Sequence, residues 1–598
     1  MRSSVLNGLL VGLLSRYATA QTPATTDFDW GIVKPSTSLD YTSCYDDFRC
    51  AKLSVPLDWL NNSTTANGTS RVTIAIITLP ATVDETDPSF GGTIIVNPGG
   101  PGGSGVDFLL EVGKYLQGMA DDTKHYEFLS FDPRGVSRTE PSSDCYNNEF
   151  ARDLAAFEMR AVGPLDSGLE VVRRQTALWG AFGRLCEDGA EIHAYMSTAS
   201  VARDMVEIVD KLDEARGRNG TAKVSSRGGA RLLGQRQGAD VPRIQYWGLS
   251  YGTVIGNYFA SMFPGRVGRI ILEGVVDAND YTRGAWSTNL QDTDKDYATF
   301  WSTCFDAGSK CALYQSNDTS ADDIRTRFDA WLDELNESPA PYISGSNIEA
   351  ITRTDVINYV FGGLYEPLQY FPSGAAILAG AMQGNLSTLY ASIGVPQAAS
   401  FCPSTAPTSY TWTNDALAAI GCGDATSQAN LTTPEYMDYV GLLKSQSPDF
   451  AAYWARIRLG CKGWRVRPAY RFEGPFTTPP ADARIVDGKP AAPLLFLSSQ
   501  YDPVTPHANA VAMAAGHPGA RVLTQNNAGH GTMLVPGTCR DGYVKKYFET
   551  GELPPEGTVC QPDCVPFQDC PQAPLVTRGL KGGIPRSARR GKAPLSIW

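Results

Sequence analysis

Five residues, Gly-Leu-Ser-Tyr-Gly at positions 248–252, constrain the fold of this chain more than any other feature of its sequence. They stand between an apolar run at 244–247, typical of a strand, and a helical pattern at 251–263 that stops at Pro264. In such a strand–turn–helix connection the turn is tight, and the flanking glycines keep the central serine clear of the neighbouring backbone. The alternative is an ordinary glycine-bearing turn. The context favours an exposed, reactive hydroxyl, so we predict that Ser250 is a nucleophile.

Short apolar runs recur at both ends of the chain and predict a sheet. They lie at residues 72–79, 93–96, 128–131, 244–247, 270–272, 494–497 and 522–523. Several lack the alternation of a half-exposed strand, which is typical of parallel strands buried on both faces. Helical patterns lie between them, as at residues 201–212. The sequence therefore predicts an α/β fold, a mostly parallel sheet flanked by helices.

The sheet pattern stops near Asp280 and resumes near Pro493. Long helical patterns between these points, at 322–335 and 434–459, predict a mainly helical cap inserted between two late strands. We place the first part of the core at residues 21–285, the cap at 286–480 and the second part of the core at 481–575. Residues 216–240, rich in Gly, Arg and Ser, predict a flexible surface insertion.

The two ends of the chain predict segments outside the fold. Residues 1–20 combine Arg2, an apolar run at 5–14 and small residues before position 20, which is typical of a secretory signal peptide. Residues 576–598 form a basic tail that we expect to be disordered. We therefore expect a secreted, extracellular protein without an integral membrane anchor.

An oxidising compartment agrees with the cysteines and sequons. We expect the disulfides Cys44–Cys50, Cys145–Cys186, Cys304–Cys311 and Cys539–Cys560, with Cys564–Cys570 a further pair. In the cap, Cys402, Cys422 and Cys461 compete for partners, and an odd total of 13 leaves at least one thiol outside an intramolecular pair. Glycosylation is expected at the sequons of Asn61, Asn62, Asn67, Asn219, Asn317, Asn336, Asn385 and Asn430. The net charge of −12 argues against a nucleic-acid partner.

A serine nucleophile needs a base, and the base needs an acid to orient it. His530 follows the last predicted strand, as the chain order Ser…Asp…His requires. Asp502 follows the strand before it and is our predicted acid, with a turn-capping role before Pro503 as the alternative. Asp277, at the end of the strand at 270–272, is its rival.

A glycine-rich segment at 97–105, Asn-Pro-Gly-Gly-Pro-Gly-Gly-Ser-Gly, follows the strand at 93–96 and predicts an oxyanion hole. We assign the two donors as the backbone amides of Gly100 and Tyr251. As a phosphate loop the segment lacks a following Gly-Lys-Ser/Thr. No histidine lies near Cys560, Cys564 and Cys570 to complete a zinc site. We therefore expect no cofactor and no metal.

Together these motifs resemble the tripeptidyl-aminopeptidase-like serine hydrolases, α/β hydrolases related to proline iminopeptidase. The resemblance rests on residues 97–105, 132–135, 247–253 and 501–506 and on the C-terminal segment 539–560, and it runs from about Cys44 to Cys564. It implies the α/β-hydrolase fold and an exopeptidase that releases short peptides from a free N-terminus, although other members act on esters.

An aminopeptidase also needs a carboxylate to hold the free α-amino group of its substrate. Glu273, just past the strand at 270–272, is our candidate, and a structural carboxylate that caps a turn is the alternative. The leading function is exopeptidase cleavage through an acyl-enzyme, with a peptide as substrate. The runner-up is a carboxylesterase or lactonase acting on small esters, and a non-enzymatic binding protein is a third reading that the intact site residues disfavour. Oligomeric state is not predicted.

Overall fold

The computed structural model describes residues 28–60, 70–146, 148–189, 191–218, 241–345, 347–393, 410–568 and residue 570. The predicted signal peptide, the basic tail at 576–598 and most of the insertion at 216–240 lie outside these ranges, as do four of the sequons and Cys402. The sequon residues Asn317, Asn336, Asn385 and Asn430 are all exposed.

One mixed sheet forms the core of the molecule, in the order β1-β3-β4-β6-β5-β7-β8-β11-β12-β13, with β2 paired to β3. The pairs β3·β4 and β4·β6 are antiparallel, and every pair from β6 through β13 is parallel. The strands are β1 (Pro35–Ser36), β2 (Thr42–Cys44), β3 (Phe48–Pro56), β4 (Arg71–Leu79), β5 (Phe90–Asn97), β6 (His125–Phe131), β7 (Ile244–Leu249), β8 (Val267–Glu273), β11 (Leu495–Tyr501), β12 (Arg521–Ala528) and β13 (Val559–Cys560). This is the α/β-hydrolase fold that the sequence predicts.

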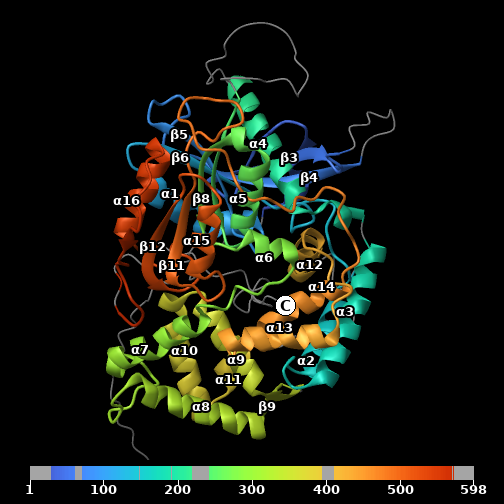
Figure 1. Ribbon diagram of the computed structural model, residues 1–598, viewed down its shortest axis with the longest axis vertical. Helices are drawn as coiled ribbons and strands as arrows, with labels where there is room; N and C mark the ends of the chain where they lie inside the picture. Colours follow the sequence, from blue (N-terminus) through green and yellow to red (C-terminus); the bar gives the residue numbers. More distant parts are fainter. Residues whose placement is uncertain are drawn as a thin grey trace, which may run out of the picture.

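Helices cover both faces of the sheet, which is why the apolar runs in the sequence are nearly continuous. Neighbouring side chains on a strand enter different cores: Ile94 and Phe128 belong to one, Ile95 and Leu129 to the other. Helices α1 (Gly105–Ala120) and α16 (Thr538–Thr550) pack together over one face (Figure 1). The other face is covered by α4 (Thr198–Arg218) and α5 (Tyr251–Met262), which also pack together.

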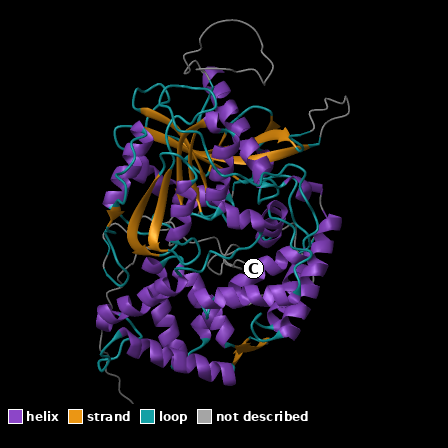
Figure 2. Ribbon diagram, in the orientation of Figure 1, coloured by secondary structure: helices purple, strands orange, loops and turns teal. Residues whose placement is uncertain are grey.

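A helical cap lies below the carboxyl ends of the parallel strands (Figures 1 and 2). Between β8 and β11 it contains α6 (Ala278–Arg283), α7 (Thr293–Ala307), α8 (Ala321–Glu337), α9 (Arg353–Leu364), α10 (Pro367–Met382), α11 (Ser387–Ser392), α12 (Thr413–Asp424), α13 (Thr433–Gln446) and α14 (Ala451–Gly463), with the hairpin β9 (Ala340–Ser344) and β10 (Asn347–Ile351). The late position of this insertion agrees with the sequence pattern.

An earlier segment of the chain also packs against the cap. Helices α2 (Glu149–Val162) and α3 (Leu169–Gly189) precede Ser250 in the chain and fall within our predicted core range 21–285, yet α3 packs against α14 of the cap. The contact is close because two glycines meet there: a Cβ on Gly183 would lie 1.9 Å from the carbonyl oxygen of Gly463. An amphipathic helix pattern reports that one face is buried but does not identify the partner, so the boundary was drawn without this contact.

Disulfides link residues in both the core and the cap. Four join the predicted pairs Cys44–Cys50, Cys145–Cys186, Cys304–Cys311 and Cys539–Cys560. In the cap Cys422 pairs with Cys461, and Cys564 pairs with Cys570 near the C-terminal end of the described chain. None of the helices in the described ranges is both long and apolar enough to cross a membrane.

Candidate active site

Ser250 lies at the connection between β7 and α5 with φ 55° and ψ −124°, a conformation that non-glycine residues rarely adopt. The surrounding bonds hold it there, because its backbone N–H donates to the carbonyl of Glu273 at 3.0 Å and its carbonyl accepts from Thr253 N at 2.8 Å. The flanking residues must be glycines because a side chain would clash there: a Cβ on Gly248 would lie 2.3 Å from the Gly252 carbonyl oxygen. The predicted strand–turn–helix geometry is therefore present.

His530 and Asp502 are brought together by the loops that follow β12 and β11. The Nδ1 atom of His530 lies 3.1 Å from Oδ1 and 3.2 Å from Oδ2 of Asp502. The carboxylate is completely buried and also accepts from the backbone amides of Val504, Thr505 and Gly531 at 2.7–3.0 Å. The positive form of His530 and these hydrogen bonds outweigh the burial of Asp502 and lower the pKa of its carboxyl.

The rival acid lies elsewhere. Asp277 accepts from the backbone amides of Asn279 and Asp280 at 2.8 and 3.2 Å and caps the first turn of α6. His517 also lies elsewhere: it is buried against Asn257 Oδ1 at 2.9 Å, and burial lowers its pKa to about 4.

The glycine-rich segment lies against the turn that carries Ser250. Gly99 approaches so closely that a Cβ there would lie 2.9 Å from that of Ser250. Gly100, with φ 113°, lines the same small pocket as Ser250, Tyr251 and His530. Tyr251 is the first residue of α5, where a backbone N–H has no acceptor within its own helix. Both predicted oxyanion donors therefore lie beside the serine.

The pocket that contains Ser250 and His530 has a volume of about 70 Å³ and mostly apolar walls. Its walls come from the core and from the cap, and they include Val254, Val276, Tyr281, Trp286, Tyr365, Leu417, Trp454, Ile457 and Val504. The cap also positions the histidine. The Tyr365 carbonyl accepts from His530 N at 3.0 Å, and the two rings meet edge to face with centroids 5.1 Å apart.

Glu273 does not line this pocket. Its carboxylate is completely buried, and Oε2 accepts from Trp247 Nε1 at 2.8 Å. The other oxygen accepts from Thr532 N, Thr532 Oγ1 and Met533 N at 2.6–2.8 Å. The structure thus corrects our candidate: the position at the strand end is right, but the side chain points into the loop that carries His530 and ties it to β7 and β8. The structural alternative fits these contacts.

Glu366 is a residue near the site that the sequence did not reveal. It precedes Pro367 at the start of α10 and follows Tyr365, whose carbonyl and ring both contact His530. Half-burial raises the pKa of the Glu366 carboxyl to about 7, with the nearby Glu111 adding to the rise and His530 opposing it. No cation pairs with this carboxylate in the part of the chain that the structure describes.

The segment Asp132-Pro-Arg-Gly135 has a supporting role. Arg134 is completely buried and forms two bonds with Asp204, at 2.6 and 2.7 Å, and donates to the carbonyls of Pro56 and Leu57. Asp132 accepts from Ser104 Oγ and Val106 N at the start of α1, directly after the glycine-rich segment. These buried charges are paired, as such groups must be, and they fix the loops beside the site.

A sharp turn that presents a serine, a buried Asp–His pair and a glycine-rich loop on an α/β-hydrolase fold define the class: the protein is a serine hydrolase. Residues 447–560 match the family model described as TAP-like protein. The tripeptidyl aminopeptidase of Streptomyces lividans is 26% identical over 542 residues, 90% of this chain and 86% of that protein. The chain is therefore a distant homologue of the tripeptidyl aminopeptidases with a TAP-like C-terminal region, as its motifs predict.

Two further relatives differ in the activity that their names give. Serine protease Hip1 of Mycobacterium tuberculosis is 26% identical over 528 residues, 86% of this chain and 87% of that protein. Carboxylesterase B of the same species is 25% identical over 533 residues, 86% of each chain. Among solved structures, an α/β hydrolase from a Medee basin deep-sea metagenome library covers 82% of this chain and 98% of its own, at 11% identity and a TM-score of 0.27.

Proposed function

We propose that this protein is a serine exopeptidase that releases short peptides or single residues from free N-termini. Ser250 Oγ attacks the scissile carbonyl carbon while His530 Nε2 takes the hydroxyl proton, and Asp502 holds the imidazole in the required orientation. The Gly100 and Tyr251 amides donate hydrogen bonds to the oxyanion of the tetrahedral intermediate and so stabilise its negative charge. His530 then returns the proton to the leaving amine, and water hydrolyses the acyl-enzyme by the same steps.

The observation that carries the exopeptidase proposal is the position of Glu366. A half-buried carboxylate without a cation partner, beside the catalytic histidine, is a binding place for a positive group. The α-ammonium of a peptide supplies that charge, and pairing with it would remove the cost of leaving Glu366 ionised and alone. We propose the substrate-binding role for Glu366, which is not part of the lining of the Ser250 pocket but follows Tyr365, which is.

The small apolar pocket supports a short substrate segment on the acyl side of the scissile bond. A volume of about 70 Å³ admits a small apolar group and not a long extended chain. A chain end fixed by Glu366 and a small apolar residue next to the scissile bond are compatible with cleavage close to the N-terminus.

The second candidate function is hydrolysis of small carboxylic esters. The apolar walls of the pocket favour it, since a short acyl group would need no ammonium contact. The relative named carboxylesterase B gives it independent support. Every catalytic residue named above would serve both reactions.

One experiment separates the two candidates. Alanyl p-nitroanilide, its N-acetyl form and p-nitrophenyl acetate are compared on the wild type, Glu366→Gln and the surface control Glu337→Gln. We expect Glu366→Gln to lower kcat/KM for the free-amine substrate by roughly tenfold to a thousandfold, at about 1.4 kcal/mol per decade, because the ammonium loses a charged partner. The ester should be unaffected, and the control should behave as wild type. Efficient wild-type turnover of the N-acetyl substrate would instead favour an endopeptidase or an esterase.

We also propose that the enzyme is secreted. The six disulfides of the described chain support an oxidising compartment. The exposure of Asn317, Asn336, Asn385 and Asn430 is compatible with glycans. The intact mass of the mature protein, before and after glycosidase treatment, tests both points.

A further inference from the structure

The cap encloses a second cavity, much larger than the catalytic pocket. Its volume is about 840 Å³, within the range of small-molecule sites, which is roughly 300–1,000 Å³. Its walls come from α2, α3, α9, α12 and α14 together with the hairpin, so it lies within the cap rather than at the core. None of the residues with proposed catalytic roles lines it.

Three helices separate the two cavities. In α9 and the residue that follows it, Phe361 lines the cap cavity and Tyr365 the catalytic pocket. In α14, Tyr453 and Arg456 line the cap cavity, whereas Trp454 and Ile457 line the catalytic pocket. The partition is aromatic, since Phe361 contacts Tyr453 with ring centroids 5.1 Å apart. In α12, Asn414 lines the cap cavity and Leu417 lines the catalytic pocket.

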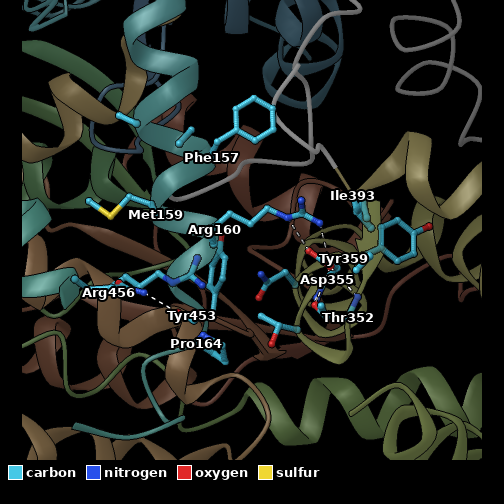
Figure 3. A pocket seen from close by; sticks show the side chains of 18 of the residues that line it. Phe157, Met159, Arg160, Pro164, Thr352, Asp355, Tyr359, Ile393, Tyr453 and Arg456 are labelled. Atoms are coloured by element: carbon cyan, nitrogen blue, oxygen red, sulfur yellow. Dashed lines mark hydrogen bonds and ion pairs between the residues drawn. The ribbon is translucent and has the colours of Figure 1, made fainter. Parts of the chain in front are cut away.

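The other arginines around the cap cavity are already paired with acids. Arg160 forms ion pairs with Glu349 and Asp355 at 3.1 and 3.2 Å. Arg152 pairs with Asp144 and Asp415 at 2.5 and 2.7 Å. In Figure 3 the Arg160 side chain extends towards Asp355, while Arg456 lies beside Tyr453 on the other side of the cavity.

Arg456 differs from the other cations in the wall. No acid of the described ranges lies within ion-pair distance of it, although the more distant Asp355 attracts its charge, and its Nε atom is buried without a hydrogen-bond acceptor. Its guanidinium lies 5.5 Å from the Tyr453 ring centroid. Burial lowers the pKa of Arg456, yet a guanidinium stays protonated in proteins. A half-buried charge of this kind is stabilised by an anion that enters the cavity.

The walls also limit the chemistry of that anion. The planar fork of the one wall guanidinium outside an ion pair matches a carboxylate through two parallel hydrogen bonds. The wall also has an apolar part, which includes Phe157, Met159, Phe182 and Phe361. A phosphate dianion would need a second free cation, which the described walls do not supply, because Arg152, Arg160 and Arg353 are already paired.

We propose that the cap cavity is a second ligand site, which binds a monocarboxylate with an apolar body through Arg456. This site is independent of the exopeptidase proposal, since none of its walls carries a proposed catalytic residue. Such a carboxylate comes either from the C-terminus of a short apolar peptide or from a free organic acid.

Calorimetric titration of the full-length protein tests the site with two probes, N-acetylphenylalanine and 4-phenylbutyrate, each beside its primary amide. The protein is first treated with a fluorophosphonate, and the titration is repeated on untreated protein, so that occupation of the catalytic pocket is separated from binding in the cap. We expect at least one acid to bind about tenfold or more tightly than its amide, in treated and untreated protein alike. Binding of N-acetylphenylalanine would indicate the C-terminus of a peptide as the natural ligand, and binding of 4-phenylbutyrate would indicate a free organic acid.

The variant Arg456→Gln should abolish this preference for the acid. Arg458→Gln is the matched control, because Arg458 lies on the same helix but contacts Gln428 and the Tyr439 ring instead of the cavity. Arg456→Lys keeps the charge and should retain part of the preference, which tests the site even if the glutamine variant folds poorly. Equal affinity for acids and amides, equal losses in Arg456→Gln and Arg458→Gln, or binding that disappears after fluorophosphonate treatment would each overturn the proposal.

Discussion

His530 Nδ1 lies 3.1 Å from Oδ1 of Asp502, and Gly531 N donates to Oδ2 of the same carboxylate at 2.8 Å. Asp502 therefore holds both the imidazole and the backbone that follows it. Because the carboxylate is completely buried, water does not compete for these bonds. Asp502 orients the proposed base together with Thr505, whose Oγ1 also lies 3.1 Å from His530 Nδ1, and with the Tyr365 carbonyl, which accepts from His530 N.

Replacing that acid gives the first prediction. Asp502→Asn should lower kcat by roughly a thousandfold to ten-thousandfold, because an amide cannot stabilise the imidazolium and favours the wrong tautomer. Asp277→Asn should change kcat by less than about threefold, since asparagine caps a helix nearly as well as aspartate. Steady-state rates on one chromogenic substrate are sufficient. A severe loss in Asp277→Asn with a mild one in Asp502→Asn would move the acid to Asp277.

Glu273 gives the second prediction. In Glu273→Gln the new amide N–H₂ group would face donors, because Trp247 Nε1, Thr532 N and Met533 N all point at the carboxylate. We expect the free energy of unfolding to fall by about 1–3 kcal/mol. Activity on peptides and on esters should fall by the same factor. A loss confined to free-amine peptides, with unchanged denaturant unfolding, would restore the substrate role.

The third prediction concerns pH. Because the pKa of Glu366 is raised to about 7, the carboxyl is neutral below this pH and attracts an ammonium only above it. KM for free-amine peptides should therefore fall as pH rises through about 7, and rise again near 7.7–8.0, where the α-amino group itself loses its proton. An ester should show neither change, and Glu366→Gln should remove both. A pH-independent KM for free-amine peptides would count against the assignment.

The same shift gives the fourth prediction, for stability. A carboxyl whose pKa is raised by folding contributes stability that is present below its ordinary value of 4.5 and is lost as pH rises to about 7. Glu366→Gln should therefore melt at a higher temperature than the wild type at pH 8 and at nearly the same temperature at pH 4. Melting curves at the two pH values measure the difference. A variant that is less stable than the wild type at pH 8 would mean that Glu366 is paired in the free protein.

The sequence predicts those parts of the site that depend on local structure. The turn around Ser250 is recognisable in the sequence. Asp502 and His530 each follow an apolar run that forms a parallel strand, so chain order alone places them at the edge of the sheet where these strands end. Glu273 also lies at that edge. Its side-chain direction, however, depends on the loop at 530–533, which approaches from a distant part of the sequence.

The cap was less predictable. Glu366 carries no local signal, since a glutamate before a proline is typical of many helix starts, and only the packing of α9 and α10 against the core brings it near His530. The packing of α2 and α3 with the cap likewise depends on a long-range contact, which joins Gly183 and Gly463. Periodicity detects such helices but not their partners.

The central claim is that Ser250 is the nucleophile, and covalent labelling tests it most directly. The mature protein is treated with a fluorophosphonate, and its labelled peptide is identified by mass spectrometry, in the wild type and in Ser250→Ala. We expect one adduct, on the peptide that contains Ser250, and no adduct or turnover in the variant; His530→Ala should retain Ser250 but lose activity by several orders of magnitude. Labelling of another serine in Ser250→Ala, with activity retained, would contradict the account.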